Sequence, residues 1–233
     1  MTSKNNIIKG INEALVSEID SITFDKPPTE KHLDVMNKPS SLVTIDWKNV
    51  LPEPPKNSSK ITRRELEYIS SITNELSEEE YILVTEVDKD PNNVFIGLLK
   101  KYGLEFPKEK FEEFYFEQVD PIILSLKHKY NRARPYQLAE KYGIEINVTE
   151  TDTHHTPAYP SGHTAYAAFA GSMLATLYPE HTSKFYELIN LAGRARILQG
   201  VHYPSDNDAS MVIASVIYED LKYKIFPDIK IRG

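Results

Sequence analysis

The chain of 233 residues contains no cysteine. This absence excludes disulfide bonds, thiol catalysis and cysteine-ligated metals, although it does not select a cellular compartment. A long apolar run is also missing, because the longest weakly polar stretch, residues 164–178, includes Ser172 and Thr176. That stretch is shorter than the ~20 residues of a membrane-spanning helix. We therefore interpret it as a buried core helix and expect no membrane span.

The N-terminus lacks the features of a secretion signal. Charged side chains interrupt every hydrophobic stretch of residues 1–20, namely Lys4, Lys9, Glu13 and Glu18. A signal peptide would need a continuous apolar region at this place. The sequence therefore favours a soluble, cytoplasmic protein.

An excess of positive charge is also absent, since the formal net charge is −7. Nucleic-acid-binding proteins usually have the opposite balance, so we expect no nucleic-acid partner. The positive charge is instead local: four cations and no acid lie within residues 127–134, namely Lys127, Lys129, Arg132 and Arg134. An acidic protein with one basic pocket suits a small anionic substrate better than a polymer.

Alternation of apolar and polar residues, which is typical of β-strands, is almost absent, and residues 145–149 are the one weak candidate. Apolar residues recur instead at helical spacing. The expected helices cover residues 62–76, 77–87, 91–102, 108–129, 161–177, 183–199 and 205–223, and Pro121 should split the fourth of them. We predict an all-α fold, a single-domain multi-helix bundle of the kind that packs around one core.

Residues 1–60 have a different character. Six prolines lie between residues 23 and 60, and proline favours extended chain because it lacks an N–H and restricts its predecessor. We therefore divide the chain into an extended N-terminal segment, residues 1–60, that wraps over a helical catalytic domain, residues 61–233. A disordered linker is the alternative for the first segment.

The first of three basic or histidine-containing clusters holds Lys127 and Arg134. They are about two helical turns apart, and Pro135 disfavours helical geometry at Arg134, so the helix should end there. Both cations can then converge on one anion, the guanidinium with two parallel donors and the ammonium as a point charge. The alternative is a solvated basic helix end that complements the helix dipole.

The second cluster is the sequence Pro160–His163, which precedes a run of small residues. Ser161 is a natural N-cap, and Gly162 lets an anion approach the backbone at the positive end of a helix. His163 lies in the first turn, at the edge of such a site. A plain capped helix with a packed histidine is the alternative.

The third cluster runs from Arg196, near a helix end, through Gly200 as a C-cap, to His202 and Asp206. A carboxylate four residues after a histidine, across a turn, can accept a hydrogen bond from one ring nitrogen. The other nitrogen is then free to act as a nucleophile. A surface histidine–aspartate pair is the alternative.

Taken together, Lys-x6-Arg-Pro, Pro-Ser-Gly-His and Arg-x5-His-x3-Asp resemble the type 2 phosphatidic acid phosphatase (PAP2) superfamily. That superfamily includes soluble bacterial acid phosphatases, membrane lipid phosphatases and vanadium haloperoxidases. The motifs cover residues 127–206. Residues 51–55 resemble a segment near the start of the soluble acid phosphatases, and residues 1–49 match nothing in the family.

The resemblance implies a role for each matching residue. The non-bridging oxygens of a phosphate would be held by Lys127, Arg134, Ser161, Gly162 and Arg196. His202 would attack phosphorus and become a phosphohistidine, oriented by Asp206. His163 would protonate the leaving oxygen and then activate water. No metal is needed, because fixed cations take its place.

The chain departs from its apparent relatives at Ala195, where the family usually has serine before the arginine of the third motif. We expect slower turnover or altered affinity, and not inactivity, because neither a charge nor a nucleophile is lost. The missing secretion signal is a second departure, since similar acid phosphatases are commonly exported.

The sequence thus predicts a phosphoric monoester hydrolase without a cofactor, acting on a small phosphorylated substrate, and it leaves a homo-oligomer open. A vanadate-dependent haloperoxidase is the main alternative, with vanadate bound in the same pocket and ligated by His202. A lipid phosphatase without membrane spans and a non-catalytic anion-binding protein are weaker alternatives. His154 and His155 are expected in a solvated loop beside the pocket.

Overall fold

The structure is a computed structural model that describes residues 2–150 and 153–225. The α-helices are α1 (Thr2–Asp20), α2 (Glu30–Met36), α3 (Trp47–Val50), α4 (Lys60–Thr73), α5 (Glu78–Lys89), α6 (Asn93–Tyr102), α7 (Lys108–Gln118), α8 (Asp120–Tyr130), α9 (Pro135–Ala139), α10 (Gly162–Leu177), α11 (Thr182–Leu198) and α12 (Pro204–Ile225). Two 3₁₀ helices, η1 (Glu140–Tyr142) and η2 (Pro179–His181), complete the set. The described residues contain no β-sheet, only an isolated bridge between Thr23 and Arg132. The predicted all-α class is confirmed.

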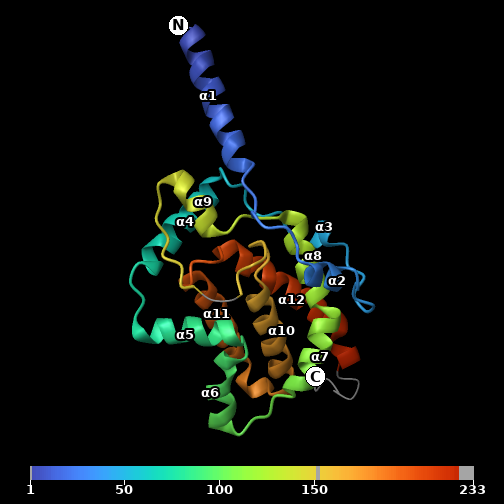
Figure 1. The fold of residues 1–233 in the computed structure, drawn as a ribbon. Helices are drawn as coiled ribbons and strands as arrows, with labels where there is room; N and C mark the ends of the chain where they lie inside the picture. The colour runs from blue at the N-terminus through green and yellow to red at the C-terminus, as the bar shows by residue number, and fades with distance from the viewer. Residues whose placement is uncertain (1, 151–152, 226–233) are drawn as a thin grey trace.

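Helix α10 lies at the centre of the bundle and packs most extensively against α11 and α12 (Figure 1). Its sequence is apolar all round, with small residues on most faces, so it suits a helix that neighbours surround on every side. Burial on all sides fixes α10 rigidly, and its N-terminus therefore provides a firm base for residues 161–163.

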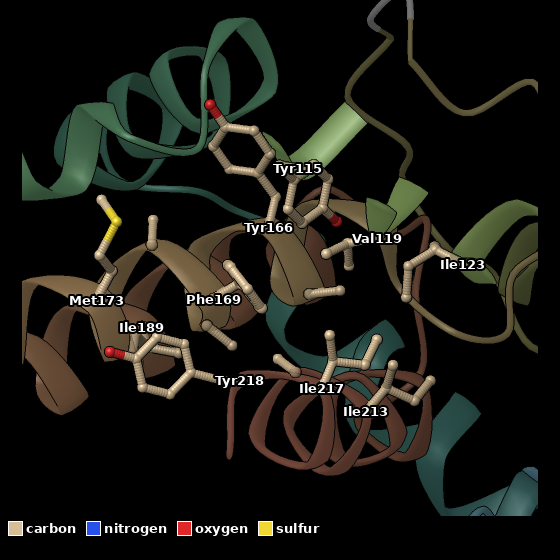
Figure 2. Close-up of a cluster of buried hydrophobic side chains, with 14 of the residues drawn as sticks. Tyr115, Val119, Ile123, Tyr166, Phe169, Met173, Ile189, Ile213, Ile217 and Tyr218 are labelled. Atoms are coloured by element: carbon tan, nitrogen blue, oxygen red, sulfur yellow. The ribbon is translucent and has the colours of Figure 1, made fainter. Parts of the chain in front are cut away.

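The main hydrophobic core surrounds α10 (Figure 2). Tyr166, Phe169 and Met173 project from α10 toward aromatic and aliphatic side chains of the helices around it. The partners labelled in Figure 2 are Tyr115, Val119, Ile123, Ile189, Ile213, Ile217 and Tyr218. Edge-on aromatic contacts order this cluster, among them Tyr115 against Tyr166 at 4.8 Å between ring centroids.

The N-terminal segment departs from the extended form that the sequence predicted. Residues 2–20 form the helix α1, which extends away from the other helices (Figure 1). The prediction was wrong there because it rested on the prolines, and all of these lie at Pro27 or beyond. The short helices α2 and α3 also interrupt the irregular chain of residues 21–60.

Residues 21–60 nevertheless lie against the helical body. The side-chain oxygen of Gln118 accepts hydrogen bonds from the Ser40 hydroxyl and the Ser41 N–H. Val43 and Leu51 are buried in the main core. The division of the chain at residue 60 into two units stays a prediction.

Three pairs in the sequence have the spacing of a capping box, namely Thr62 with Glu65, Ser77 with Glu80 and Ser205 with Asp208, and two of these three predicted caps need correction. The Ser77 hydroxyl and the Glu80 carboxylate form the expected capping box at the start of α5. The cap of α4 is Ser59 and not Thr62, whose own N–H donates to the Ser59 hydroxyl. Ser205 lies inside the first turn of α12, where its N–H and hydroxyl bind Glu65 instead of making a cap with Asp208.

The helix breaks follow the sequence more closely. The long helix predicted over residues 108–129 is split into α7 and α8 just before Pro121, as expected. Helix α8 then ends at Tyr130, one residue beyond the expected range of residues 108–129 and four residues before Arg134, because Asn131 adopts the left-handed conformation with φ 45°. Pro135 begins α9, a position that tolerates the missing N–H.

Residues 145–149, the weak strand candidate, form no strand. The N–H of Thr149 donates to the carbonyl of Gln199 at the end of α11, at 3.2 Å. This segment therefore pairs with a helix end and not with a strand. Ile144 and Ile146 pack at the edge of a second apolar cluster. Their hydrophobicity therefore serves to anchor a loop.

Within the part of the chain that the structure describes, no helix is both long enough and apolar enough to cross a membrane.

Replacing Gly171 by alanine should destabilise the protein by about 1–3 kcal/mol, because a methyl group at this position would overpack the core. Gly171 lies in α10, and a Cβ there would come within 2.5 Å of the Ile189 side chain on α11. Gly97→Ala is the matched control, since nothing lies within 4 Å of its added Cβ on α6. Urea unfolding should show a lower midpoint for Gly171→Ala and an unchanged or higher one for Gly97→Ala. Equal midpoints would refute the tight contact between α10 and α11.

Candidate active site

The predicted site residues come from the ends of five helices, α8 to α12, and from the connection between α11 and α12. Lys127 lies in the last turn of α8, and Arg134 lies directly before α9. Ser161 caps α10, which brings His163 into its first turn. Arg196 lies in the last turn of α11, His202 in the connection that follows, and Asp206 in the first turn of α12. The fold gathers these helix ends at one place, and the side chains contact one another as described below.

The two cations of the first cluster are buried, with 5% of Lys127 and 1% of Arg134 exposed. The left-handed turn at Asn131 redirects the chain between α8 and Arg134. Lys127 Nζ donates to the carbonyl of Pro157 at 2.7 Å, and Arg134 Nε donates to the carbonyl of Thr156 at 2.9 Å. The loop before α10 thus holds both cations in place.

The hydrogen bonds of His202 fix its tautomer. Arg134 Nη1 lies 2.9 Å from Nε2 of His202, and a guanidinium can only donate, so Nε2 carries the lone pair. The opposite ring nitrogen, Nδ1, lies 3.0 Å from Oδ2 of Asp206 and must carry the proton. His202 therefore presents an unprotonated Nε2 among the cations, which is the form a nucleophile needs.

Asp206 is fully buried and held from several directions. Its Oδ2 accepts from the N–H of Tyr203 at 2.9 Å as well as from His202. Its Oδ1 accepts from Arg132 Nη1 at 2.6 Å. The carboxylate is thus fixed in the orientation that holds the His202 ring.

The start of α10 matches the sequence prediction only in part. The Ser161 hydroxyl accepts from the N–H of Thr164 and lies 2.8 Å from the Thr164 hydroxyl, so it acts as the helix cap. A Cβ added at Gly162 would lie 3.7 Å from Cε of Lys127, which places the helix N-terminus beside that cation. Gly162 and His163 line the cavity described below, whereas Ser161 does not.

Arg196 has a partner that the sequence analysis missed. Its Nη1 donates to Oδ1 of Asp88 at 2.5 Å, and its Nη2 donates to the Thr153 hydroxyl at 3.0 Å. The Asp88 backbone carbonyl also lies 3.2 Å from Nε2 of His163, which must then carry a proton as the donor. Asp88, at the end of α5, therefore connects Arg196 with His163.

These groups border a cavity of about 550 Å³. Five of the predicted site residues line it, namely Lys127, Arg134, Gly162, His163 and His202. Arg196 and Asp206 are not among the lining residues. The outer wall contains Lys31 and His32 from α2, together with Phe116, Lys108 and Glu112 from α7. The size is typical of a small-molecule site.

The electrostatics of the cavity favour an anion. Burial and then the neighbouring Arg134 hold the pKa of Lys127 well below its ordinary value. Burial and then Arg196 lower the pKa of Arg134 to about 10. Cations that depress one another in this way are stabilised when a negative charge enters between them. A dianion such as a phosphate ester would provide that charge.

Burial and the same cations also lower the pKa values of the two histidines. Burial and then the charge of Arg196 lower the pKa of His163 to about 3. Burial and then Arg134 hold the pKa of His202 well below the usual 6.5. Without a bound anion both rings are therefore neutral at physiological pH.

Stability should fall as the pH drops below about 6.5, because the unfolded chain protonates these histidines while the folded protein keeps them neutral. His163 has its folded pKa at about 3, so its contribution is complete above 6.5 and is lost progressively toward 3. The urea midpoint of the protein should be lower at pH 5 than at pH 7.5. The loss should be smaller in His163→Gln, which has no group to titrate. An identical loss in both proteins would contradict this prediction.

Other residues that the sequence singled out lie apart from the cavity wall. His154 packs edge-on against Tyr136, with 5.9 Å between ring centroids, and the exposed His155 lies beside it. Neither residue is among those lining the cavity. Ala195 is buried in a small apolar cluster with Val87, Ala167 and Ala192. The effect of Ala195 on turnover stays a prediction.

Comparison with known proteins gives two kinds of match. Residues 119–218 match the model of the PAP2 superfamily. A non-specific acid phosphatase of Providencia stuartii is 34% identical over 98 residues, which are 41% of this chain and 38% of that protein. An acid phosphatase of Zymomonas mobilis is 32% identical over 92 residues, which are 38% of this chain and 33% of that protein. The alignments therefore span between about a third and two fifths of the length of these relatives.

Among solved structures, a bacterial vanadium-dependent chloroperoxidase in its holo form has a similar fold. The TM-score is 0.59 with 14% sequence identity, and the match covers 82% of this chain and 55% of that one. At this identity the likeness concerns the fold alone.

Proposed function

This chain carries a PAP2-superfamily region at residues 119–218, and on that premise we propose that the protein is a metal-independent phosphatase. It would hydrolyse phosphate monoesters through a phosphohistidine at His202. The observation that carries the proposal is the unprotonated Nε2 of His202, held among buried cations with its Nδ1 proton on Asp206. The acid phosphatase relatives support the same reaction class.

In the first step the lone pair on Nε2 of His202 attacks phosphorus, and the bond from phosphorus to the leaving oxygen breaks. The Arg134 N–H that donates to Nε2 in this structure then donates to a non-bridging oxygen instead. Lys127 and the N-terminus of α10 bind the non-bridging oxygens beside it. His163 gives its proton to the leaving oxygen, and an alcohol departs. The bound dianion raises the pKa of His163 from its low value, so the neutral ring takes up this second proton from solvent when the substrate binds.

In the second step His163 is neutral and accepts a proton from water. The water oxygen attacks phosphorus, the phosphorus–nitrogen bond breaks, and Nε2 of His202 regains its lone pair. Inorganic phosphate then leaves, and His163 releases the added proton to solvent until the next substrate binds. The Asp206 carboxylate balances the positive ring of His202 while the phosphoryl group is attached.

Arg196 requires one adjustment in this scheme, because Asp88 binds it in this structure. A substrate phosphate that reaches Arg196 would compete with the Asp88 carboxylate for the same guanidinium. Arg196 has further N–H groups, so shared binding is also open to it. Because Asp88 binds Arg196, we include Asp88 in the proposed active site.

A test of the function is hydrolysis of p-nitrophenyl phosphate by the purified protein, with and without a chelator. We expect turnover that the chelator does not change and that inorganic phosphate inhibits. Activity that disappears with the chelator would contradict the metal-independent reaction. No hydrolysis of any aryl or alkyl phosphate would refute the proposed function.

Vanadate-dependent halide oxidation is the second candidate, favoured by the fold shared with the chloroperoxidase. The donor set fits a vanadate ion, since Nε2 of His202 carries a lone pair that could ligate vanadium in place of the Arg134 contact, and the cations would bind its oxygens. Vanadate would supply peroxide activation when bound. Halide oxidation by peroxide, measured with and without added vanadate, separates the two activities.

A further inference from the structure

One buried cation beside the site has no part in the scheme above. Arg132 lies between Lys127 and Arg134 in the sequence, yet it does not line the cavity. Only 4% of the residue is exposed. A charge buried so deeply is unfavourable unless it is paired and hydrogen-bonded, so Arg132 must be held by partners inside the protein.

Arg132 faces the side of Asp206 that is turned away from His202. Its Nη1 donates to Oδ1 of Asp206 at 2.6 Å and also to the Ser205 hydroxyl at 2.8 Å. Since His202 uses Oδ2, the carboxylate is clamped between an arginine and a histidine. Rotation of this carboxylate would break one contact or the other.

A second carboxylate, that of Glu65, binds the other terminal nitrogen of Arg132. Oε2 of Glu65 accepts from Arg132 Nη2 at 3.2 Å. Oε1 of Glu65 accepts from the N–H of Ser205 at 2.7 Å, which ties α4 to the first turn of α12. Glu65 is 8% exposed, so the series from Glu65 through Arg132 to Asp206 is buried throughout.

The guanidinium plane is fixed by an aromatic ring as well. Its central carbon lies 3.8 Å from the ring centroid of Tyr203, the residue next to His202. This contact is a cation–π interaction and restricts the remaining freedom of Arg132. The residues that hold Arg132 are therefore contributed by α4, the α11–α12 connection and the first turn of α12.

We propose that Arg132 and Glu65 form a positioning pair that sets the orientation and charge of the His202–Asp206 dyad. The proposal rests on the phosphatase function proposed above. Neither residue touches the phosphate. Arg132 acts by fixing Oδ1 of Asp206, and Glu65 acts by fixing Arg132 and offsetting its positive charge.

The two members of the pair should influence His202 in opposite directions. Arg132 places a positive charge behind the dyad, so its removal makes His202 easier to protonate. Glu65 places a negative charge there, so its removal makes His202 harder to protonate. The charged groups that face His202 from the other elements are unchanged in both variants, namely Lys127, Arg134, Arg196 and His163.

The test uses Arg132→Gln, Glu65→Gln and the double variant, with the acidic limb of the pH profile of kcat/KM as the measurement. We expect the apparent pKa of this acidic limb to rise by about 1 unit in Arg132→Gln and to fall in Glu65→Gln. The double variant should return near the position of the unmodified protein. We also expect kcat to fall by about 10- to 100-fold in Arg132→Gln with little change in KM, because the phosphate contacts remain.

Breaking a buried ion pair is strongly destabilising, so Arg132→Gln could fail to fold. Arg132→Lys keeps the charge and replaces Arg132→Gln in the test in that case. We expect a lower kcat in Arg132→Lys and an acidic limb close to that of the unmodified protein. Arg194→Gln is the matched control, since Arg194 pairs with Glu80 at 3.1 Å on an exposed face. Limbs that move in the same direction in the two single variants, or that do not move, would overturn the proposal.

Failure of the proposed function would leave a different signature. If the unmodified protein hydrolyses no phosphate monoester, the positioning pair can still be followed by NMR through the Nδ1 proton of His202. Its hydrogen bond to Asp206 predicts a downfield resonance, which Arg132→Gln should shift and Arg194→Gln should leave in place. An unchanged resonance in Arg132→Gln would overturn the proposal independently of any activity.

Discussion

His202→Ala should lower the turnover of a phosphate monoester by about 10³-fold or more, because the proposed nucleophile is lost. The cations that hold the phosphate remain, so inorganic phosphate should still bind. Steady-state hydrolysis of p-nitrophenyl phosphate gives the first quantity, and calorimetric titration with phosphate gives the second. The combination separates a missing nucleophile from a collapsed pocket.

His155→Ala is the matched control for this substitution. His155 is exposed and does not line the cavity, so we expect turnover close to that of the unmodified protein. Turnover in His202→Ala that equals the control would exclude His202 as the nucleophile.

His163→Asn should have an effect that depends on the leaving group. Alkyl phosphates need a proton on the leaving oxygen, so their turnover should fall by about 10²- to 10⁴-fold. p-Nitrophenolate leaves without a proton, so formation of the phosphoenzyme from p-nitrophenyl phosphate should be far less affected. Activation of water would still be impaired, because the same residue is the base of the second step.

Rapid mixing of His163→Asn with p-nitrophenyl phosphate should therefore give a burst of p-nitrophenolate followed by a slow steady state. Equal losses for alkyl and aryl substrates, without a burst, would refute the role of His163 as general acid. The unmodified protein is the control in the same experiment. A burst there would show that its second step also limits turnover.

The local features of the fold could be predicted from the sequence because each depends on nearby residues. The capping pair of Ser77 and Glu80, the break before Pro121 and the end of α6 at Gly103 are all encoded within a few positions. Pro135 predicted a helix end at Arg134, whereas α8 ends at Tyr130 because Asn131 adopts positive φ, which residues other than glycine rarely do.

The candidate site was predictable to the extent that its motifs lie close together in the chain. Contacts between distant segments were not. Asp88 lies 108 positions before Arg196, and Glu65 lies 140 positions before Ser205. Both acids stand in helical stretches where a charge usually faces solvent, so periodicity alone gives no sign of an inward-facing carboxylate.

Ser161 illustrates a different limit. Its position in the second motif suggested a phosphate contact, and the same hydroxyl is also the natural N-cap of α10. In the structure it serves the helix, with Thr164 as its partner. A cap and an anion site draw on the same geometry at a helix N-terminus, so sequence alone could not separate them.

The central claim is a covalent phosphoryl group on Nε2 of His202, and trapping this intermediate tests it most directly. His163→Asn would be mixed with p-nitrophenyl phosphate, quenched with base to preserve a phosphohistidine, digested and examined by mass spectrometry. We predict one phosphoryl group on the peptide that contains His202, and none when His202→Ala is added to His163→Asn. Hydrolysis that proceeds without any phosphorylated His202, or a phosphoryl group found on another residue, would contradict the proposed mechanism.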